Sequence, residues 1–141
     1  MTSPLIDRLT QEFGYPTLDA SNYDDFIANN ETVALFFAND PAKFPETLDL
    51  AVILPELHKA FKDRFTPAVI DRSYEKELQQ RFDFKAWPAL VFLRDGQYLG
   101  NTTRIQDWSD YMSDIPAILD AMPSRNPGLG IPVVTEFGAQ S

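Results

Sequence analysis

The sequence predicts an α/β protein, in which helices pack on a β-sheet. Segments with apolar residues at helical spacing alternate along the chain with short runs of β-branched and aromatic residues. One of these runs, 32–38, is continuously apolar, as expected of a central strand that is buried on both faces. Another run follows Pro88 and leads into Asp95-Gly96, which are typical turn residues of a tight β-hairpin. At 141 residues with 44% hydrophobic content, the chain is long enough to bury one core.

The N-terminal part of the chain is expected to contain two short helices and an edge strand. Ser3 fits the N-cap of a first amphipathic helix, and Gly14 fits its stop. The segment 16–18 reads as a short edge strand. Ser21 is then expected to cap a second helix over 21–28, whose first turn contains acidic residues.

The remaining elements continue the alternation of helix and strand. After the central strand, a polar loop is expected over 39–50 and a helix over 51–61 that Pro55 interrupts. The other expected elements are a strand over 66–71, a helix over 73–82 capped by Ser73, the hairpin after Pro88, and a last helix that starts at Asp107 or Ser109 and contains Pro116. We therefore predict a single domain over 1–122 and a tail rich in turn formers over 123–141.

Composition excludes several kinds of chemistry. The chain contains no cysteine, so it forms no disulfide, uses no thiol nucleophile of its own and binds no cysteine-ligated metal. A single histidine argues against a zinc site built from imidazoles, and no cofactor or metal is expected. The formal net charge of −9 argues against nucleic acid or an anionic membrane as a partner, although basic residues are in excess between Lys59 and Arg104. With no basic leader and no apolar stretch of membrane-spanning length, we expect a cytoplasmic protein without membrane insertion.

The pair Trp87-Pro88 lies directly before the strand that begins the hairpin. Proline is tolerated at the first residue of a strand, and an X-Pro bond is the place where a cis peptide is accessible. With these elements in order, the chain resembles the thioredoxin-like superfamily. The run 33–38 is similar to the thioredoxin strand that precedes the redox motif, Pro55 matches the helix-kinking proline, and Pro88 matches the cis-proline. This resemblance implies a three-layer α/β/α fold with a central mixed β-sheet.

The position of the redox motif in this chain is taken by 39–43, which contains no thiol. The disulfide exchange of thioredoxins therefore cannot occur there. A narrower resemblance is to the HyaE/HupG-type accessory proteins of [NiFe]-hydrogenases, which are thioredoxin-like chaperones without redox cysteines. It covers about Pro16 to Met122 and depends on the segments 39–41, 45–49, 52–57, 81–82 and 87–92.

The resemblance implies a chaperone in hydrogenase maturation rather than an enzyme. Its partner would be the precursor of the hydrogenase small subunit, bound through the twin-arginine signal peptide until export is permitted. A receptor for an arginine pair and an apolar segment should present carboxylates near an apolar groove. We expect such a peptide-binding rim at Asp40, Glu46, Asp49 and Glu56, with Trp87 and Pro88 as an apolar platform and docking edge.

The same residues also fit plainer roles. Glu46, Asp49 and Glu56 match the carboxylates that favour a helix start, Asp40 matches a turn, and Trp87 matches core filling.

Two other functions stay open at this point. One is an enzyme of the glutathione transferase type that uses a hydroxyl, such as that of Ser21 or Tyr23. The other is a structural adaptor that makes contact through the tail over 123–141. The sequence leaves the oligomeric state open, a homo-oligomer included.

Overall fold

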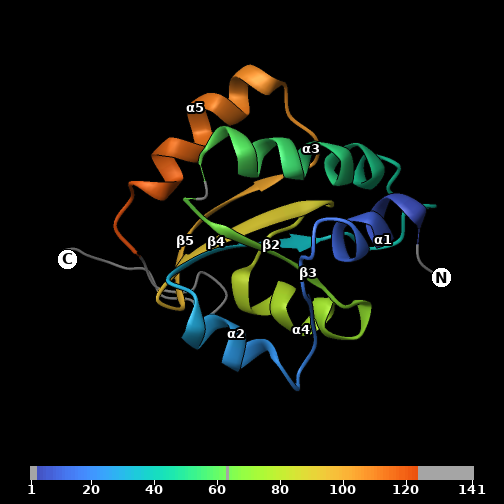
Figure 1. Ribbon diagram of the computed structural model, residues 1–141, viewed down its shortest axis with the longest axis horizontal. Coiled ribbons are helices and arrows are strands. Elements are labelled where there is room, and N and C mark those ends of the chain that lie inside the picture. Colours follow the sequence, from blue (N-terminus) through green and yellow to red (C-terminus); the bar gives the residue numbers. More distant parts are fainter. Residues whose placement is uncertain (1–2, 63, 124–141) are drawn as a thin grey trace.

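The computed structural model describes residues 3–62 and 64–123, so the predicted tail lies outside the described residues except for Pro123. Its centre is one five-stranded sheet with the order β1-β3-β2-β4-β5 (Figure 1). The strands β1, β3 and β2 run parallel, whereas β4 is antiparallel to β2 and to β5. The strands are β1 (Thr17–Leu18), β2 (Thr32–Phe37), β3 (Thr66–Ile70), β4 (Ala89–Arg94) and β5 (Gln97–Thr103).

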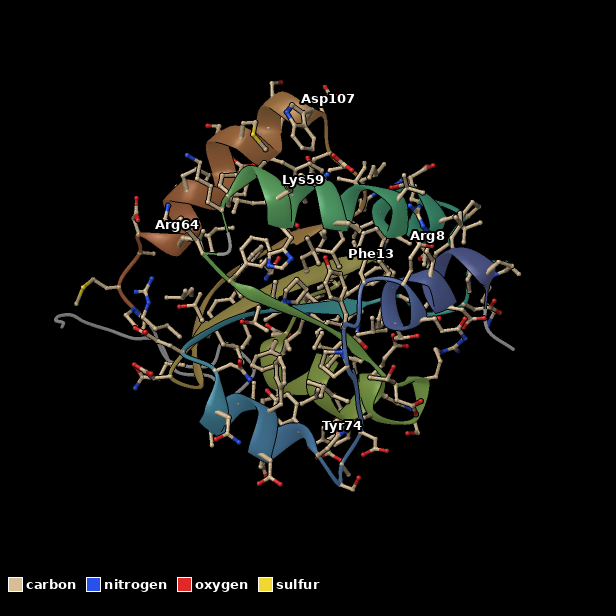
Figure 2. All side chains as sticks on the ribbon, in the orientation of Figure 1. Arg8, Phe13, Lys59, Arg64, Tyr74 and Asp107 are labelled. Atoms are coloured by element: carbon tan, nitrogen blue, oxygen red, sulfur yellow. The ribbon has the colours of Figure 1, made fainter. Side chains whose placement is uncertain are left out.

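Helices cover both faces of this sheet. Three of them, α1, α3 and α5, lie on one face, and α2 and α4 lie on the other (Figure 1). The helices are α1 (Pro4–Gln11), α2 (Tyr23–Asn29), α3 (Glu46–Ala60), α4 (Arg72–Phe82) and α5 (Trp108–Leu119). Figure 2 shows Lys59 of α3 and Tyr74 of α4 on opposite sides of the sheet. The predicted three-layer α/β/α fold with a mixed central sheet is confirmed.

The central strand β2 supplies side chains to both cores. Phe36 packs into the core beneath α1, α3 and α5, whereas Leu35 and Phe37 pack into the core on the α2 and α4 side. All three side chains are fully buried. This alternation is the period-two geometry of a strand, and it explains why the run 32–38 is apolar without interruption.

Helix α3 begins earlier than the sequence predicts. It starts at Glu46, so the loop expected over 39–50 is shorter and the helix expected from residue 51 gains one and a half turns. The added turns contain Thr47 and Leu50, both fully buried against the sheet. The sequence predicts that Pro55 interrupts this helix, but α3 continues through it, and the proline is buried. Pro41 and Pro45 favour a loop in the sequence. The start of α3 is instead determined by the packing of its first turns against the sheet.

Two predicted helix caps are wrong because a neighbouring residue takes that position. At α4 the cap is Asp71, whose carboxylate accepts the Ser73 N–H at 3.0 Å, while the Ser73 hydroxyl donates to Asp71. At α2 the helix follows Asn22, and Ser21 donates its hydroxyl hydrogen to Asp19 instead of capping. The predicted cap of α1 is confirmed, because the Ser3 side chain accepts the Leu5 N–H.

The hairpin and the bond before it are as predicted. The Trp87-Pro88 peptide is cis, and β4 starts directly after it. Asp95 and Gly96 connect β4 to β5 with φ values of 52° and 77°, which is the left-handed region that a tight two-residue turn requires. Pro88 therefore lies at the end of the sheet opposite to the hairpin turn, where β2 also ends.

Candidate functional site

Three chain segments enclose a surface pocket of about 410 Å³ next to the cis peptide bond. One segment joins β2 to α3, the second joins α4 to β4, and the third follows β5. Pro88 itself is buried and does not line the pocket. The lining residues are Lys43, Phe44, Pro45, Glu46, Lys85, Ala86, Trp87 and Arg104.

Trp87 forms the apolar wall of this pocket. Its ring is half-buried, and its centroid lies 5.0 Å from that of Phe84 in an edge-to-face arrangement. The centroids of Phe37 and Phe44 lie 6.4 Å from it. Such aromatic pairs stabilise by roughly 0.5–1.5 kcal/mol each beyond the area that they bury. Trp87 therefore fills part of the core, which was the alternative role that the sequence allowed, and also forms a fixed surface in the pocket.

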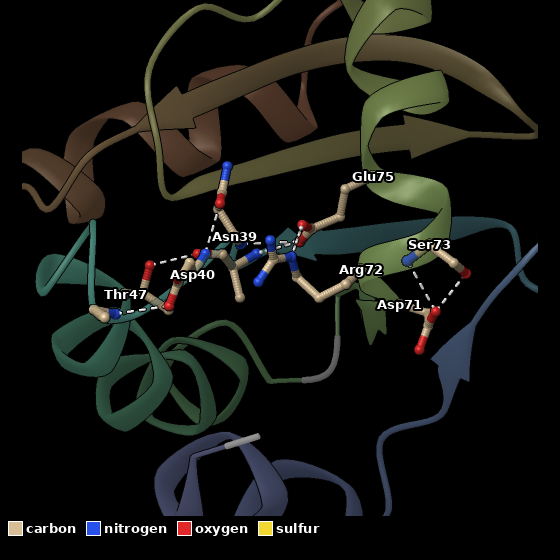
Figure 3. Close-up of polar contacts among 9 residues, drawn as sticks. Asn39, Asp40, Thr47, Asp71, Arg72, Ser73 and Glu75 are labelled. Atoms are coloured by element: carbon tan, nitrogen blue, oxygen red, sulfur yellow. Dashed lines mark hydrogen bonds and ion pairs between the residues drawn. The ribbon is translucent and has the colours of Figure 1, made fainter. Parts of the chain in front are cut away.

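A buried carboxylate fixes the segment that follows β2 (Figure 3). Glu75 of α4 is only 3% exposed, and its Oε2 accepts the backbone N–H of Ala38 at 2.9 Å and that of Asn39 at 3.0 Å. Its Oε1 lies 3.2 Å from Arg72 Nε. Burial raises the pKa of Glu75, and the two backbone N–H groups and Arg72 oppose that rise.

Further hydrogen bonds complete the turn after β2. The Thr47 hydroxyl donates to the Ala38 carbonyl at 2.6 Å, and the Asn39 side-chain oxygen accepts the Asp40 N–H at 2.6 Å. Asp40 in turn accepts the Ala42 N–H at 2.9 Å, which gives Asp40 the turn-forming role that the sequence left open. The segment that would carry a redox motif is thus a fixed turn without a thiol.

Glu46 is engaged within the protein. Its Oε1 accepts the Ile105 backbone N–H at 2.8 Å, and its Oε2 accepts a hydrogen bond from Arg104 at 3.0 Å. The Ile105 N–H and then the positive charge of Arg104 lower the pKa of Glu46, and slight burial opposes them. Both carboxylate oxygens therefore join the start of α3 to the segment after β5.

The other expected carboxylates lie outside the pocket. Asp49 is exposed and has no ion-pair partner among the residues that the structure describes. Glu56 is exposed, with its Oε2 4.0 Å from Lys59 Nζ. Ten residues of helix separate Glu46 from Glu56, which is roughly 15 Å along the axis. Of the four carboxylates expected to form one rim, three are instead distributed along α3, and Asp40 lies in the turn before it.

The hydroxyls of the enzyme alternative do not reach the pocket. The Ser21 hydroxyl donates to Asp19, and Tyr23 is 4% exposed. Burial raises the pKa of Tyr23 to about 12, and the nearby Arg81 opposes that rise. A hydroxyl activated for nucleophilic attack needs a lowered pKa or an adjacent base, so this geometry gives the alternative no support.

Sequence reasoning missed Glu75, Lys85 and Arg104. Glu75 reads as an ordinary acid in the first turn of a helix, and its contact with Ala38 spans 37 residues, so no local pattern identifies it. The basic excess between Lys59 and Arg104 is the one signal that points toward Lys85 and Arg104. Within the described ranges, no group of metal-ligating side chains comes together, and none of the helices has the length and apolarity to cross a bilayer.

Comparison with known proteins gives one consistent result. The family model of the hydrogenase-1 expression protein HyaE matches residues 5–111. The hydrogenase expression/formation protein HoxO of Azotobacter vinelandii is 51% identical over 119 residues, which cover 84% of this chain and 80% of HoxO. A crystal structure of the hydrogenase expression/formation protein HupG from Rhodopseudomonas palustris is 41% identical with a TM-score of 0.54, and covers 74% of this chain and 94% of that one.

Thioredoxins are similar in fold alone. The Plasmodium falciparum thioredoxin superposes with a TM-score of 0.59 at 16% identity, over 72% of this chain and 96% of the thioredoxin. The predicted thioredoxin-like fold is confirmed by this likeness.

Proposed function

The chain belongs to the HyaE family of hydrogenase expression proteins, and from this membership we propose that it binds the twin-arginine signal peptide of a [NiFe]-hydrogenase small-subunit precursor. It would hold the precursor in the cytoplasm until cofactor assembly permits export. It would act by binding rather than by chemistry, because no thiol lies beside the cis-proline.

The exposed face of α3 is the observation that carries this proposal. Asp49 and Glu56 are two helical turns apart, so they lie on the same side of the helix. Between them Val52 is 45% exposed, although it is apolar. An arginine guanidinium binds a carboxylate through two parallel hydrogen bonds, and the valine offers contact for an apolar neighbour. We call Asp49, Val52 and Glu56 the α3 face.

The pocket at the N-terminal end of α3 would contribute the apolar part of the site. Trp87 provides a fixed aromatic wall, and the cis peptide to Pro88 sets the direction of the chain there. Asp40 lies in the turn between β2 and α3, and its carboxylate would add to those of the α3 face. Glu46 has a positioning role in this proposal, because Ile105 and Arg104 already occupy both of its oxygens.

The proposal is tested by titrating a synthetic twin-arginine signal peptide into the full chain by calorimetry. Replacing Asp49→Asn together with Glu56→Gln should weaken binding about tenfold at low salt, since two charged contacts together contribute about 1–2 kcal/mol. The matched control is Asp24→Asn with Glu31→Gln, which changes the net charge equally but lies at the α2 end of the fold. Equal affinity of the two double variants would contradict the α3 face as the binding surface.

A further inference from the structure

The pocket beside the cis-proline has the opposite charge character to the protein as a whole. The chain has a formal net charge of −9, but the charged lining residues are Lys43, Lys85 and Arg104 against Glu46 alone. Glu46 is already paired with Arg104 at 3.0 Å. The lysines therefore determine the local charge that a visiting group would meet.

The countercharges near these lysines are few. Lys85 lies 3.0 Å from the Asp83 carboxylate, but both side chains face solvent, with 82% and 47% exposed, so this pair is weak. Lys43 has no ion-pair partner among residues 3–62 and 64–123. Two ammonium groups thus remain available to a ligand on the β2–α3 side and the α4–β4 side of the pocket.

Arg104 adds a third donor, and its backbone is fixed beside the pocket. Its N–H donates to the Pro88 carbonyl at 2.7 Å, and its φ of 61° is the left-handed conformation that residues with a Cβ rarely adopt. A guanidinium has five N–H donors, and Glu46 takes only one of them here. Arg104 can therefore bind a second carboxylate without giving up the first.

We propose that this pocket binds a carboxylate of a partner protein, presented by an acidic side chain next to an apolar residue. The carboxylate would lie between Lys43, Lys85 and Arg104, and the apolar neighbour would pack on Trp87 and Phe44. This anion-binding subsite shares the Trp87 wall with the apolar part of the proposed signal-peptide site. Its lysines would repel an arginine pair, so the arginines themselves would bind at the α3 face and outside the pocket. The inference does not depend on the proposed function.

The test is an NMR titration of the ¹⁵N-labelled full chain with three short capped peptides of leucine and alanine. The peptides differ only in a central glutamate, glutamine or arginine. We expect the glutamate peptide to shift the Trp87 indole N–H and the Arg104 backbone signal, and to bind at least threefold tighter than the glutamine peptide. The arginine peptide should bind most weakly of the three.

Variants locate the effect. Lys43→Gln with Lys85→Gln should weaken glutamate-peptide binding roughly fivefold at low salt, since each exposed charge contact contributes about 0.2–1 kcal/mol. Lys59→Gln with Lys76→Gln changes the net charge equally outside the pocket and should alter the affinity less than twofold. The proposal is overturned if no shift appears at Trp87, if the glutamine or arginine peptide binds as tightly as the glutamate peptide, or if both double variants weaken binding alike. None of these peptides contains an arginine pair, so failure here leaves the signal-peptide proposal to its own titration.

Discussion

Replacing Glu75 by alanine should cost about 3 kcal/mol of unfolding free energy. The change removes the acceptor for two backbone N–H groups, those of Ala38 and Asn39, at a position that is closed to water. A hydrogen bond to a charged acceptor contributes about 1.5–3 kcal/mol, and a buried donor left without a partner costs a similar amount. The ion pair with Arg72 adds little, because 59% of the Arg72 side chain is exposed. For a domain of this size the melting temperature should fall by roughly 10 °C.

Glu75→Gln is the matched variant, because its amide oxygen can accept the same two N–H groups without a charge. Burial raises the pKa of Glu75, so the folded protein binds this proton more tightly than the unfolded chain does. The resulting stability is fully present below the ordinary pKa of 4.5 and is lost as the pH rises through the raised folded pKa. The glutamine variant does not titrate at this position. Its stability relative to wild type should therefore increase as the pH rises from 4 to 7.

Urea unfolding, followed by tryptophan fluorescence and circular dichroism at several pH values, measures both effects. The reasoning is refuted if Glu75→Ala loses less than about 1 kcal/mol, which is the smallest cost of an unsatisfied buried donor. It is also refuted if Glu75→Gln loses as much as Glu75→Ala. In that case the carboxylate would not act mainly as an acceptor for the turn after β2.

Three further predictions concern the same end of the fold. Glu46→Gln should destabilise the protein at pH 7, because the lowered pKa of Glu46 stabilises the fold only while the carboxylate is ionised. This loss should begin to shrink near the ordinary pKa of 4.5 and disappear as the pH falls through the lowered folded pKa, and urea titrations at pH 7 and pH 3 check it. Thr47→Val should lower the free energy of unfolding by about 1–2 kcal/mol, because it removes the hydroxyl that donates to the buried Ala38 carbonyl. Thr47→Ser keeps that hydroxyl and should retain most of the stability. Equal losses for the two variants in chemical denaturation would argue against the hydrogen bond from Thr47 to Ala38. Asp71→Ala should lower the free energy of unfolding by about 1 kcal/mol, because it removes the cap of α4, and Ser73→Ala should lower it less. Melting temperatures check this: a lower value for Ser73→Ala than for Asp71→Ala would mean that Ser73 is the cap.

The sheet and most helices follow from the sequence because their signals are local. Three segments have conformations that their own residues determine, and the structure confirms them: the run 32–38, the Asp95-Gly96 turn and the Trp87-Pro88 pair. The start of α3 and the cap of α4 could not be predicted in the same way. The start of α3 depends on the burial of Thr47 against the sheet. The cap of α4 depends on which of two nearby suitable side chains, Asp71 or Ser73, accepts a backbone N–H.

The site was predictable only in part. Trp87 and Glu46 do line one pocket, but Asp49 and Glu56 lie along α3 and away from it. The basic residues of the pocket come from segments that meet only in the folded protein. Arg104 lies 58 positions from Glu46 in the chain, although the two side chains form a hydrogen bond. Spacing in the sequence cannot show such a pair. Counting charges by segment shows only that basic residues are in excess between Lys59 and Arg104.

The most direct test of the central claim is a calorimetric comparison of two peptides on the unmodified chain. One is a twin-arginine signal peptide of a hydrogenase small subunit, and the other is the same peptide with both arginines replaced by lysine. Lysine keeps the charge but cannot form the two-point contact with a carboxylate. We predict that the arginine peptide binds at least fivefold tighter and that the affinity of both falls with added salt. Equal binding of the two peptides, or no binding of either, would contradict the claim that this chain recognises the arginine pair.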